Sequence, residues 1–476
     1  MTPGAPAEAT AGGPGTPAAR KLDRSLVEGP IAPAVWRLAW PTVLQNAIGG
    51  LQGIIDHAMV GHYVGFTGNA AIGVSWQIFL VVIVFIASLF TGMGVLVARF
   101  AGANEPDKVN RTVYQAFLTA LILSLVVLAP LGYVLSPTLL DLVNATPEVK
   151  AEALPFLRTM FVFSIGMLLF FMLGGALRSA GDARTPLRLG ILMTVLNVAF
   201  NVVLIPGLGP IPALGTRGAA IGTVSASLIA SSIGIWLLLS GRLVVHFPET
   251  MSRRPDLKII RSLFKFGLPA GIQGVAMNIA GVMLLRFIGS LPHSAEAQAA
   301  YAVGYAELFA LITWTSVGLM GAAAAVAGQN LGAGHPERAI RGVQVAARIG
   351  IGVAAIVGAF FLLIPEYLLA IFGLDDPNVV ALGTQLLRYL CVSGFFITVA
   401  LTYTGGLQGT GDTRSPLYIT LVSQVLVPLG LCGTLQSLGR LDAAGVWSAI
   451  VLGHCTRCVL SVLRFRQGKW RQIIVE

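Results

Sequence analysis

Apolar stretches fill most of the chain between residues 37 and 465, and short polar segments separate them. Twelve of these stretches reach the roughly 20 residues that a helix needs to cross the hydrocarbon core of a bilayer. Proline lies at several of their boundaries, as at Pro130, Pro137, Pro206 and Pro365. We therefore expect an all-α polytopic membrane protein with spans over 37–62, 69–98, 112–136, 155–178, 186–206, 217–240, 260–289, 299–328, 340–364, 385–408, 416–435 and 443–465.

The composition agrees with this pattern. Apolar residues make up 55% of the 476 residues and charged residues only 11%, and the mean hydropathy is +0.80. A soluble domain carries about 25% charged residues, so this chain has too few to cover a water-facing surface of its size. Residues 1–32 are rich in Ala, Pro, Gly and Thr and lack the apolar run of a signal peptide, so we expect a disordered tail there.

The basic residues set the expected orientation. With the N-terminus in the cytoplasm, 25 of the 31 Lys and Arg residues fall in cytoplasmic loops and ends, as the positive-inside rule requires. Both termini are then cytoplasmic, and the net charge of +10 reflects attraction to an anionic membrane face rather than to nucleic acid. The six basic residues on the outer side are Lys150, Arg158, Arg217, Arg286, Arg388 and Arg440.

The chain contains an internal repeat. GGALRSAGDARTPL at 174–187 aligns with GGLQGTGDTRSPL at 405–417 at an offset of 230 residues, and GANEP at 102–106 meets GAGHP at 332–336 at the same offset. Each copy holds six spans, and because six is even, both copies enter the membrane from the same side. We expect two parallel lobes around a central cleft, as in secondary transporters. The predicted units are a tail (1–32), an N-lobe (33–245), a cytoplasmic linker (246–259), a C-lobe (260–465) and a basic C-terminal tail (466–476).

The repeated motif itself favours a tight turn between helices. Gly181 and Gly411 fit the position after a helix end, where a left-handed backbone is common. Thr185-Pro186 and Ser415-Pro416 fit the N-cap and first position of the next helix. Asp182 and Arg184 are expected to form a solvated ion pair, and a gating latch remains the alternative reading.

No sequence motif indicates an enzyme. There is no phosphate-binding G-x-x-x-x-G-K-[ST] and no H-E-x-x-H, so transport energy must come from an ion gradient or the membrane potential. Four cysteines give no disulfide framework. His454, Cys455 and Cys458 in HCTRC resemble part of a metal site, but they lie in an apolar helix without a second ligand pair, which favours core packing. We expect neither a metal nor another cofactor.

Only two of the 21 acidic residues fall well inside spans, Asp56 and Glu307. A charge in the hydrocarbon costs about 2.5–3.5 kcal/mol, so such residues face a cavity or a partner. Gln45, Gln52 and Asp56 share one helical face at spacings of seven and four, which indicates a water-lined stripe. Burial can raise the pKa of a carboxyl from about 3.9 to near 7, so Asp56 could load and release a proton. The alternative is a residue that fixes helix packing.

Two further positions leave alternatives open. Asn197 and Asn201 in NVAFN lie four residues apart on one face and could hold a neighbouring carboxyl and a water. Asparagine pairs also join membrane helices. Glu307 could line the cleft, or Arg286 at the outer end of span 7 could neutralise it.

Three sets of motifs carry a resemblance to a known family. The 6+6 spans, AWPTVLQN…DHAMVGH, GALRSAGDARTPL…LNVAFNVVLIP and AVAGQNLGAGHPERA together resemble the multidrug and toxic compound extrusion (MATE) family, with most similarity to its DinF-like, proton-coupled branch. The resemblance covers about residues 33–465. It implies a V-shaped antiporter of the bacterial inner membrane that exports cationic amphipathic compounds in exchange for H⁺ or Na⁺.

The resemblance also implies roles for individual residues. Asp56 matches the family's proton-binding Asp and Asn197 its span-5 partner, while Thr223 matches a span-6 hydroxyl and Glu307 an acid of span 8. Archaeal-type members carry a second Asp where this chain has Asn201, and Na⁺-coupled members carry acids in spans 7 and 10, where this chain has none. Coupling to H⁺ through Asp56, Asn197 and Asn201 is therefore favoured over Na⁺. The expected substrate cleft includes Gln45, Gln52, Thr223 and Glu307.

Two other function classes compete with this interpretation. A lipid-linked saccharide flippase of the same wider superfamily would often have 14 spans and a cleft rich in Arg or Lys, which this pattern lacks. A membrane sensor would need a ligand or signalling domain. We expect a monomer whose partners are a small-molecule substrate and the lipid bilayer.

Overall fold

The computed structural model describes Leu22, residues 24–248 and residues 251–475, and the secondary structure of these residues is helical. The first repeat contains six spans. They are α2 (Ile31–Tyr63), α3 (Phe66–Gly102), α4 (Pro106–Ile122) continued through η1 (Leu123–Leu128) into α5 (Ala129–Leu142), α6 (Pro147–Val162) with α7 (Ile165–Ser179), α8 (Arg184–Leu204) and α9 (Gly215–Leu239).

The second repeat follows the same order. Its spans are α10 (Leu257–Gly289), α11 (Ser294–Tyr301) continued through η2 (Ala302–Leu308) into α12 (Ala310–Gly332), α13 (Pro336–Leu363) with the short α14 (Pro365–Ala370), α15 (Pro377–Gly409), α16 (Arg414–Thr420) continued through η3 (Leu421–Leu426) into α17 (Val427–Ser437), and α18 (Ala443–Arg466).

The helix ends confirm the predicted duplication. An offset of 230 residues maps Pro106 onto Pro336, Pro147 onto Pro377 and Arg184 onto Arg414, and each of these six residues begins a helix. The first span of each repeat, α2 or α10, is 33 residues long. The two repeats therefore fold as two copies of one six-helix unit.

Ten helical segments of the described chain are long and apolar enough to cross a membrane, and the bent pair α6–α7 adds an eleventh. The twelfth span is α2, whose 33 residues reach about 50 Å at 1.5 Å per residue. Its polar residues, Gln45, Asn46, Gln52 and Asp56, lower its hydropathy. The predicted twelve-helix membrane fold is confirmed, and α2, the span whose apolar stretch these polar residues interrupt, carries the candidate chemistry.

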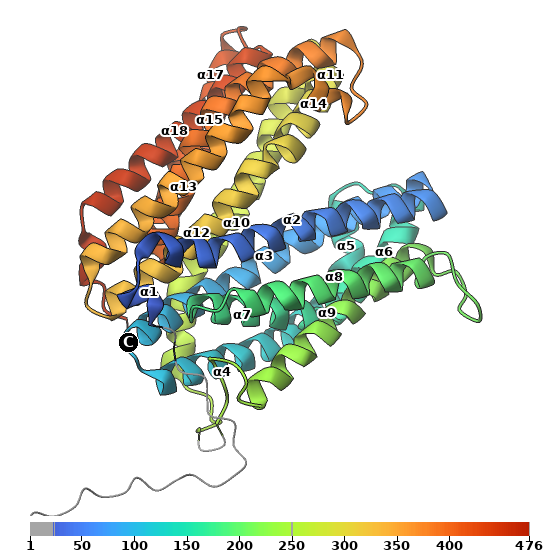
Figure 1. The fold of residues 1–476 in the computed structure, drawn as a ribbon. Coiled ribbons are helices and arrows are strands. Elements are labelled where there is room, and N and C mark those ends of the chain that lie inside the picture. The colour runs from blue at the N-terminus through green and yellow to red at the C-terminus, as the bar shows by residue number, and fades with distance from the viewer. Residues whose placement is uncertain (1–21, 23, 249–250, 476) are drawn as a thin grey trace, which may run out of the picture.

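The two repeats form two bundles that diverge like the arms of a V (Figure 1). The C-terminus and α1 (Ser25–Glu28) lie at the apex. Two repeat-related glycines bring α3 and α12 into backbone contact: a Cβ on Gly102 would lie 1.9 Å from the carbonyl oxygen of Gln329, and one on Gly332 would lie 2.1 Å from that of Arg99. Only glycine fits at these two positions.

The described part of the predicted disordered N-terminal tail is ordered, and the predicted basic C-terminal tail packs on the bundle. In α1, Leu26 is fully buried and its carbonyl accepts a hydrogen bond from Asn330 Nδ2 at 3.1 Å. Near the C-terminus, η4 (Lys469–Gln472) buries Trp470, and Arg99 Nη2 donates to the Ile473 carbonyl at 3.0 Å. These segments pack on the apex because each contains large apolar side chains. Residues 1–21 of the predicted tail lie outside the described residues.

The repeated motif forms the expected turn but with different capping. Gly181 and Gly411 have φ values of 102° and 100°, as predicted. The next helices begin at Arg184 and Arg414, so Thr185 and Ser415 lie inside the helix and are not N-caps. The capping acceptors are the carboxylates of Asp182 and Asp412, which are stronger hydrogen-bond acceptors than a hydroxyl.

The two capping carboxylates have different surroundings. Asp182 accepts from the backbone N–H of Thr185 at 3.0 Å and from its Oγ1 at 2.6 Å, and the described residues contain no Asp182–Arg184 ion pair. Asp412 is buried and pairs with Arg464 of α18 at 2.9 Å. The solvated pair predicted for Asp182 and Arg184 is therefore wrong: Asp182 caps the next helix, and its counterpart Asp412 caps a helix and also forms an ion pair.

Candidate functional site

A cavity of about 250 Å³ lies inside the N-lobe, between α2, α3, α6, α7, α8 and α9. Three small residues of α2, Gly49, Gly50 and Gly53, open its wall, and Asp56 lines it one turn further along. The remaining wall is mostly apolar, with Trp76, Phe156, Met167 and Met193 among its residues. The cavity thus exposes one carboxyl group of α2 to a small, largely apolar space.

A chain of hydrogen bonds holds this carboxyl group. Asn201 Nδ2 donates to Asp56 Oδ1 at 2.6 Å and to Asn197 Oδ1 at 3.3 Å. Asn197 Nδ2 in turn donates to Thr223 Oγ1 at 3.0 Å, and this hydroxyl donates to the Ala219 carbonyl at 3.0 Å. Asn197 and Asn201 are fully buried and Asp56 is half-buried. The direction of the chain fixes an N–H donor toward the Asp56 carboxylate.

The other end of the Asn201 amide is free within the described part of the chain. Its Oδ1 is buried and has no hydrogen-bond partner there. A Cβ on Gly222 of α9 would lie 2.4 Å from this oxygen, so glycine at that position makes room for it. Close to Asp56, the Asn201 side chain therefore has an amide N–H group that donates to the carboxylate and an amide oxygen that accepts no hydrogen bond from the described residues.

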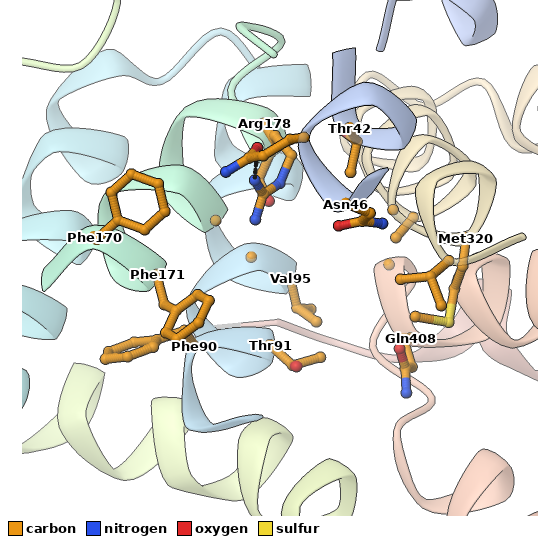
Figure 2. A pocket seen from close by; sticks show the side chains of 18 residues that line it. Thr42, Asn46, Phe90, Thr91, Val95, Phe170, Phe171, Arg178, Met320 and Gln408 are labelled. Carbon is orange, nitrogen blue, oxygen red and sulfur yellow. Dashed lines mark hydrogen bonds between the residues drawn. The ribbon is translucent and has the colours of Figure 1, made fainter. Parts of the chain in front are cut away.

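A second pocket, of about 360 Å³, lies between the lobes near the apex (Figure 2). Arg178 Nη1 donates to Gln45 Oε1 at 3.4 Å, and Asn46 Nδ2 donates across the lobes to the Trp314 carbonyl at 3.3 Å. Phe90, Phe170 and Phe171 form an aromatic wall. Arg178 is the one charged side chain among the residues that line this pocket in the described chain.

The structure divides the predicted site residues between these places. Gln45 lines the pocket between the lobes, whereas Gln52 and Thr223 line the N-lobe cavity with Asp56. Gln52 is buried there and accepts a hydrogen bond from Thr194 Oγ1 at 2.9 Å. Glu307 lies in η2, is exposed, and forms no ion pair with Arg286 or any other described residue. The stripe predicted on α2 thus serves two separate pockets.

The sequence matches a known family over both repeats. The MatE family model matches residues 41–203 and again residues 269–432, which is more than half of the chain. The chain belongs to the MatE family. The double match reproduces the internal duplication, and the resemblance to MATE transporters is confirmed.

Curated relatives match over nearly their whole length. The probable multidrug resistance protein NorM of Thermotoga maritima is 26% identical over 448 residues, covering 92% of each chain. The multidrug resistance protein MdtK of Pectobacterium atrosepticum is 26% identical over 441 residues, covering 90% of this chain and 94% of its own.

Solved structures show the same fold. An outward-facing multidrug resistance MATE transporter of the MOP superfamily superposes with a TM-score of 0.87 at 21% identity, covering 96% of this chain and 100% of that one. A MOP superfamily transporter from Pyrococcus furiosus, described as having a binding pocket of reverse polarity, superposes with a TM-score of 0.85 at 22% identity, covering 96% of this chain and 100% of that one.

This MatE-family chain has a third cavity, of about 380 Å³, inside the C-lobe. His454 of HCTRC lines it, is buried, and lies 2.5 Å through Nδ1 from Ser393 Oγ. Cys455 and Cys458 are half-buried, and no cluster of three or more possible metal ligands occurs among the described residues. The buried Arg457 does not itself line this cavity but lies next to its wall: its Nη1 is 4.0 Å from Sδ of Met277, which lines the cavity.

Sequence reasoning missed the two arginines, Arg178 and Arg457, because it assigned both to the cytoplasmic side as topology charges. Arg178 lies in α7 and Arg457 lies nine residues before the end of α18, which places it about 14 Å inside the helix. One signal was available for Arg178: the repeat aligns it with the neutral Gln408, and both residues line the pocket between the lobes.

Proposed function

We propose that this protein exports amphipathic small molecules by alternating access between its two lobes, in exchange for protons that bind Asp56. The observation that carries the proposal is the contact between Asp56 and Asn201 at 2.6 Å inside the N-lobe cavity. A single carboxyl group, held by a fixed amide and open to a cavity, is a group that can gain and lose a proton. The names of the multidrug relatives support drugs or metabolites as the exported compounds.

The Asn201 amide offers a partner for each protonation state of Asp56. A carboxylate only accepts hydrogen bonds, and Asn201 Nδ2 donates to it. A protonated carboxyl also donates, and Asn201 Oδ1, which has no partner among the described residues, can accept a hydrogen bond from that O–H after a small rotation of α2 or of the amide. Proton binding would therefore change the contact between α2 and α8. We propose that this change moves α2 and releases the substrate.

The distribution of charge favours H⁺ over Na⁺. Sodium is best held by several oxygens that include more than one carboxylate or carbonyl, and Asp56 is the one acidic residue among the described residues that line the N-lobe cavity. In the C-lobe, none of the described residues that line the cavity is acidic, and the guanidinium of Arg457 contacts Met277 of the cavity wall. A buried positive charge repels a cation, so the C-lobe is a poor place for Na⁺.

The orientation follows from the basic residues. We propose that both termini are cytoplasmic, that the protein lies in a bacterial inner membrane, and that the V therefore opens outward. The pocket between the lobes, with its three phenylalanines, would be the floor of the outward-facing cleft. Each chain contains both lobes and both pockets, which is consistent with function as a monomer.

The proposal is tested by ethidium efflux in everted membrane vesicles, with either a pH gradient or a Na⁺ gradient. The wild type should export ethidium with the pH gradient, and Asp56→Asn should not, because an amide cannot exchange the proton. Glu307→Gln is the comparison for the proton site: it also removes an intramembrane carboxyl, but Glu307 does not line the N-lobe cavity, so efflux by this variant should still depend on the pH gradient.

Two results would contradict the proposal. Efflux driven by Na⁺ alone, or full proton-driven efflux in Asp56→Asn, would remove Asp56 from the mechanism. Export of no dye by a folded wild type would instead favour the flippase interpretation.

A further inference from the structure

Arg457 is a buried charge with no carboxylate and no oxygen acceptor as partner among the described residues. Its side chain is 2% exposed, its Nε has no hydrogen-bond partner, and no carboxylate lies within ion-pair distance among the described residues. The closest recorded contact of Nη1 is the Met277 thioether at 4.0 Å, and thioethers are weak acceptors. A buried charge is normally paired, because an unpaired one is strongly destabilising.

The helix that carries Arg457 does not compensate this charge. The negative end of the α18 dipole acts within about the last turn of the helix, and Arg457 lies nine residues before the end of α18. Trp447 of the same helix also has a buried N–H without a partner among the described residues. Trp447 lies ten residues from Arg457, about 15 Å along α18, so the charge to be neutralised is that of Arg457 alone, and an anion would neutralise it.

The adjacent cavity has the size and lining of an organic ligand site. Its volume of about 380 Å³ falls in the roughly 300–1,000 Å³ range of small-molecule pockets, whereas a single water-sized ion needs on the order of 30 Å³. Met277, Leu284 and Ile450 supply apolar wall, and Tyr301 and Tyr305 supply stacked rings with centroids 5.0 Å apart. None of the described residues that line it is acidic.

We infer that the C-lobe cavity is a binding site for an amphipathic organic carboxylate, with the acidic group at Arg457 and the apolar body between the tyrosine pair and the aliphatic wall. The unpaired guanidinium determines the charge of the ligand, and the cavity volume and aromatic lining determine its class. The site lies in the opposite lobe from Asp56, and binding can be measured without transport. A result that contradicts the binding of carboxylates at this site can therefore be distinguished from a result that contradicts proton-coupled transport.

The test is calorimetric titration of the purified full-length protein, in detergent and low-salt HEPES buffer, with 2-naphthoate. The neutral analogue 2-naphthamide and sodium chloride are titrated in parallel. We expect saturable binding of 2-naphthoate and at least tenfold weaker binding of the amide, because only the carboxylate pairs with Arg457. The Asp56→Asn variant should bind 2-naphthoate as the wild type does.

Two variants locate the binding site. Arg457→Met removes the charge, and we expect at least tenfold weaker binding with no fall in melting temperature in ligand-free buffer, because an unpaired buried charge is lost. Gly281→Leu fills the cavity: Gly281 lines it, and a Cβ there would meet no atom within 4 Å. We again expect at least tenfold weaker binding, and this variant leaves Arg457 intact.

The matched controls are Arg388→Gln and Gly352→Leu, since Arg388 is an exposed arginine of the same lobe and Gly352 an open glycine of α13. Both should bind 2-naphthoate with wild-type affinity. The inference is overturned if the wild type does not bind 2-naphthoate, if it binds naphthamide equally well, or if chloride alone binds. Wild-type affinity in Gly281→Leu, or a lower melting temperature of ligand-free Arg457→Met, would also overturn it.

Discussion

At the scale of single residues, the Asp56 network depends on the placement of one amide. Asn201 is fully buried and contacts both Asp56 and Asn197, so its side chain has little freedom to take another position. The position is possible because Gly222 has no side chain next to the Asn201 oxygen. A glycine on α9 thus controls a hydrogen bond between α2 and α8.

Gly222→Ala should impair proton coupling without removing any titratable group. The new Cβ would lie 2.4 Å from Asn201 Oδ1, which must move and draw its N–H away from Asp56. A hydrogen bond to a charged group contributes about 1.5–3 kcal/mol, so we expect about a tenfold loss of proton-driven efflux. The measurement is the initial efflux rate at equal protein abundance in everted vesicles.

Gly53→Ala is the control for this prediction. Gly53 lines the same cavity, but a Cβ there would meet no atom within 4 Å, so efflux should stay near the wild-type rate. Equal rates for Gly222→Ala and wild type would show that the Asn201 contact has no part in coupling.

Sequence reasoning found Asp56 because acids inside spans are rare, and its spacing from Asn197 and Asn201 could be matched to a known family. It could not find Arg178 or Arg457, because a basic residue near a span end looks the same whether it faces the cytoplasm or a cavity. It also grouped Gln45 with Asp56 on one face of α2, although the two line different pockets. A helical face says which residues point the same way, but it does not say which neighbour covers each turn.

At the scale of elements, the two repeats contain the same turn between helices, but the aspartate that caps it makes more interactions in the second repeat. Asp182 and Asp412 cap equivalent helices, but only Asp412 is buried against an arginine of another helix. The side chain of Asp412 is 6% exposed and that of Arg464 is 27% exposed. The second repeat therefore ties its turn to α18, whereas the first keeps a local cap.

Replacing the two aspartates by alanine should separate these contributions. Asp182→Ala loses a cap, which typically contributes about 1 kcal/mol. Asp412→Ala loses a cap and leaves Arg464 without its partner, so we expect about 2–3 kcal/mol. Thermal unfolding of the purified variants in one detergent should therefore rank the melting temperatures wild type, Asp182→Ala, Asp412→Ala. Equal melting temperatures for the two variants would contradict the role of the Arg464 pair.

The sequence predicted these elements well because their ends carry strong local signals. Proline begins α4, α6, α13 and α15, and the motif glycines end α7 and α15 with positive φ. Capping was predicted wrongly because Thr185 and Asp182 are both acceptable caps by residue type, and only the backbone geometry selects between them. The 51° bend between α6 and α7 was also not predicted, since the two residues at the break, Phe163 and Ser164, are neither proline nor glycine.

At the scale of the whole molecule, the apex depends on close backbone contact between the lobes. Gly102 and Gly332 are related by the repeat, and each faces a carbonyl of the opposite lobe. Asn46 and Trp314 add a hydrogen bond across the same interface. The sequence predicted two parallel lobes but not this contact, because a repeat establishes symmetry and does not identify which residues meet at the axis.

Gly102→Ala and Gly332→Ala should each weaken closure of the apex. A Cβ at these positions would lie about 2 Å from a backbone oxygen, and backbone cannot move aside as a side chain can. We expect fewer molecules to adopt the conformation in which the two lobes are in backbone contact at the apex. Arg184 and Arg414 are exposed and equivalent in the two repeats, so each can be replaced by a spin-labelled cysteine. The distance between the two labels, measured by electron paramagnetic resonance, should increase.

Gly352→Ala serves as the control here, since its Cβ would meet no atom within 4 Å and α13 would keep its packing. Distance distributions that match the wild type in both apex variants would contradict the proposed importance of the glycine contact.

The central claim is that one carboxyl group, Asp56, couples substrate movement to proton movement. The most direct measurement is the internal pH of proteoliposomes that contain a trapped pH-sensitive dye, after ethidium is added outside without any imposed ion gradient. The account predicts that wild-type protein raises the internal pH as ethidium enters and protons leave, and that Asp56→Asn gives no pH change. Ethidium uptake by the wild type without a pH change, or a wild-type pH change in Asp56→Asn, would contradict it.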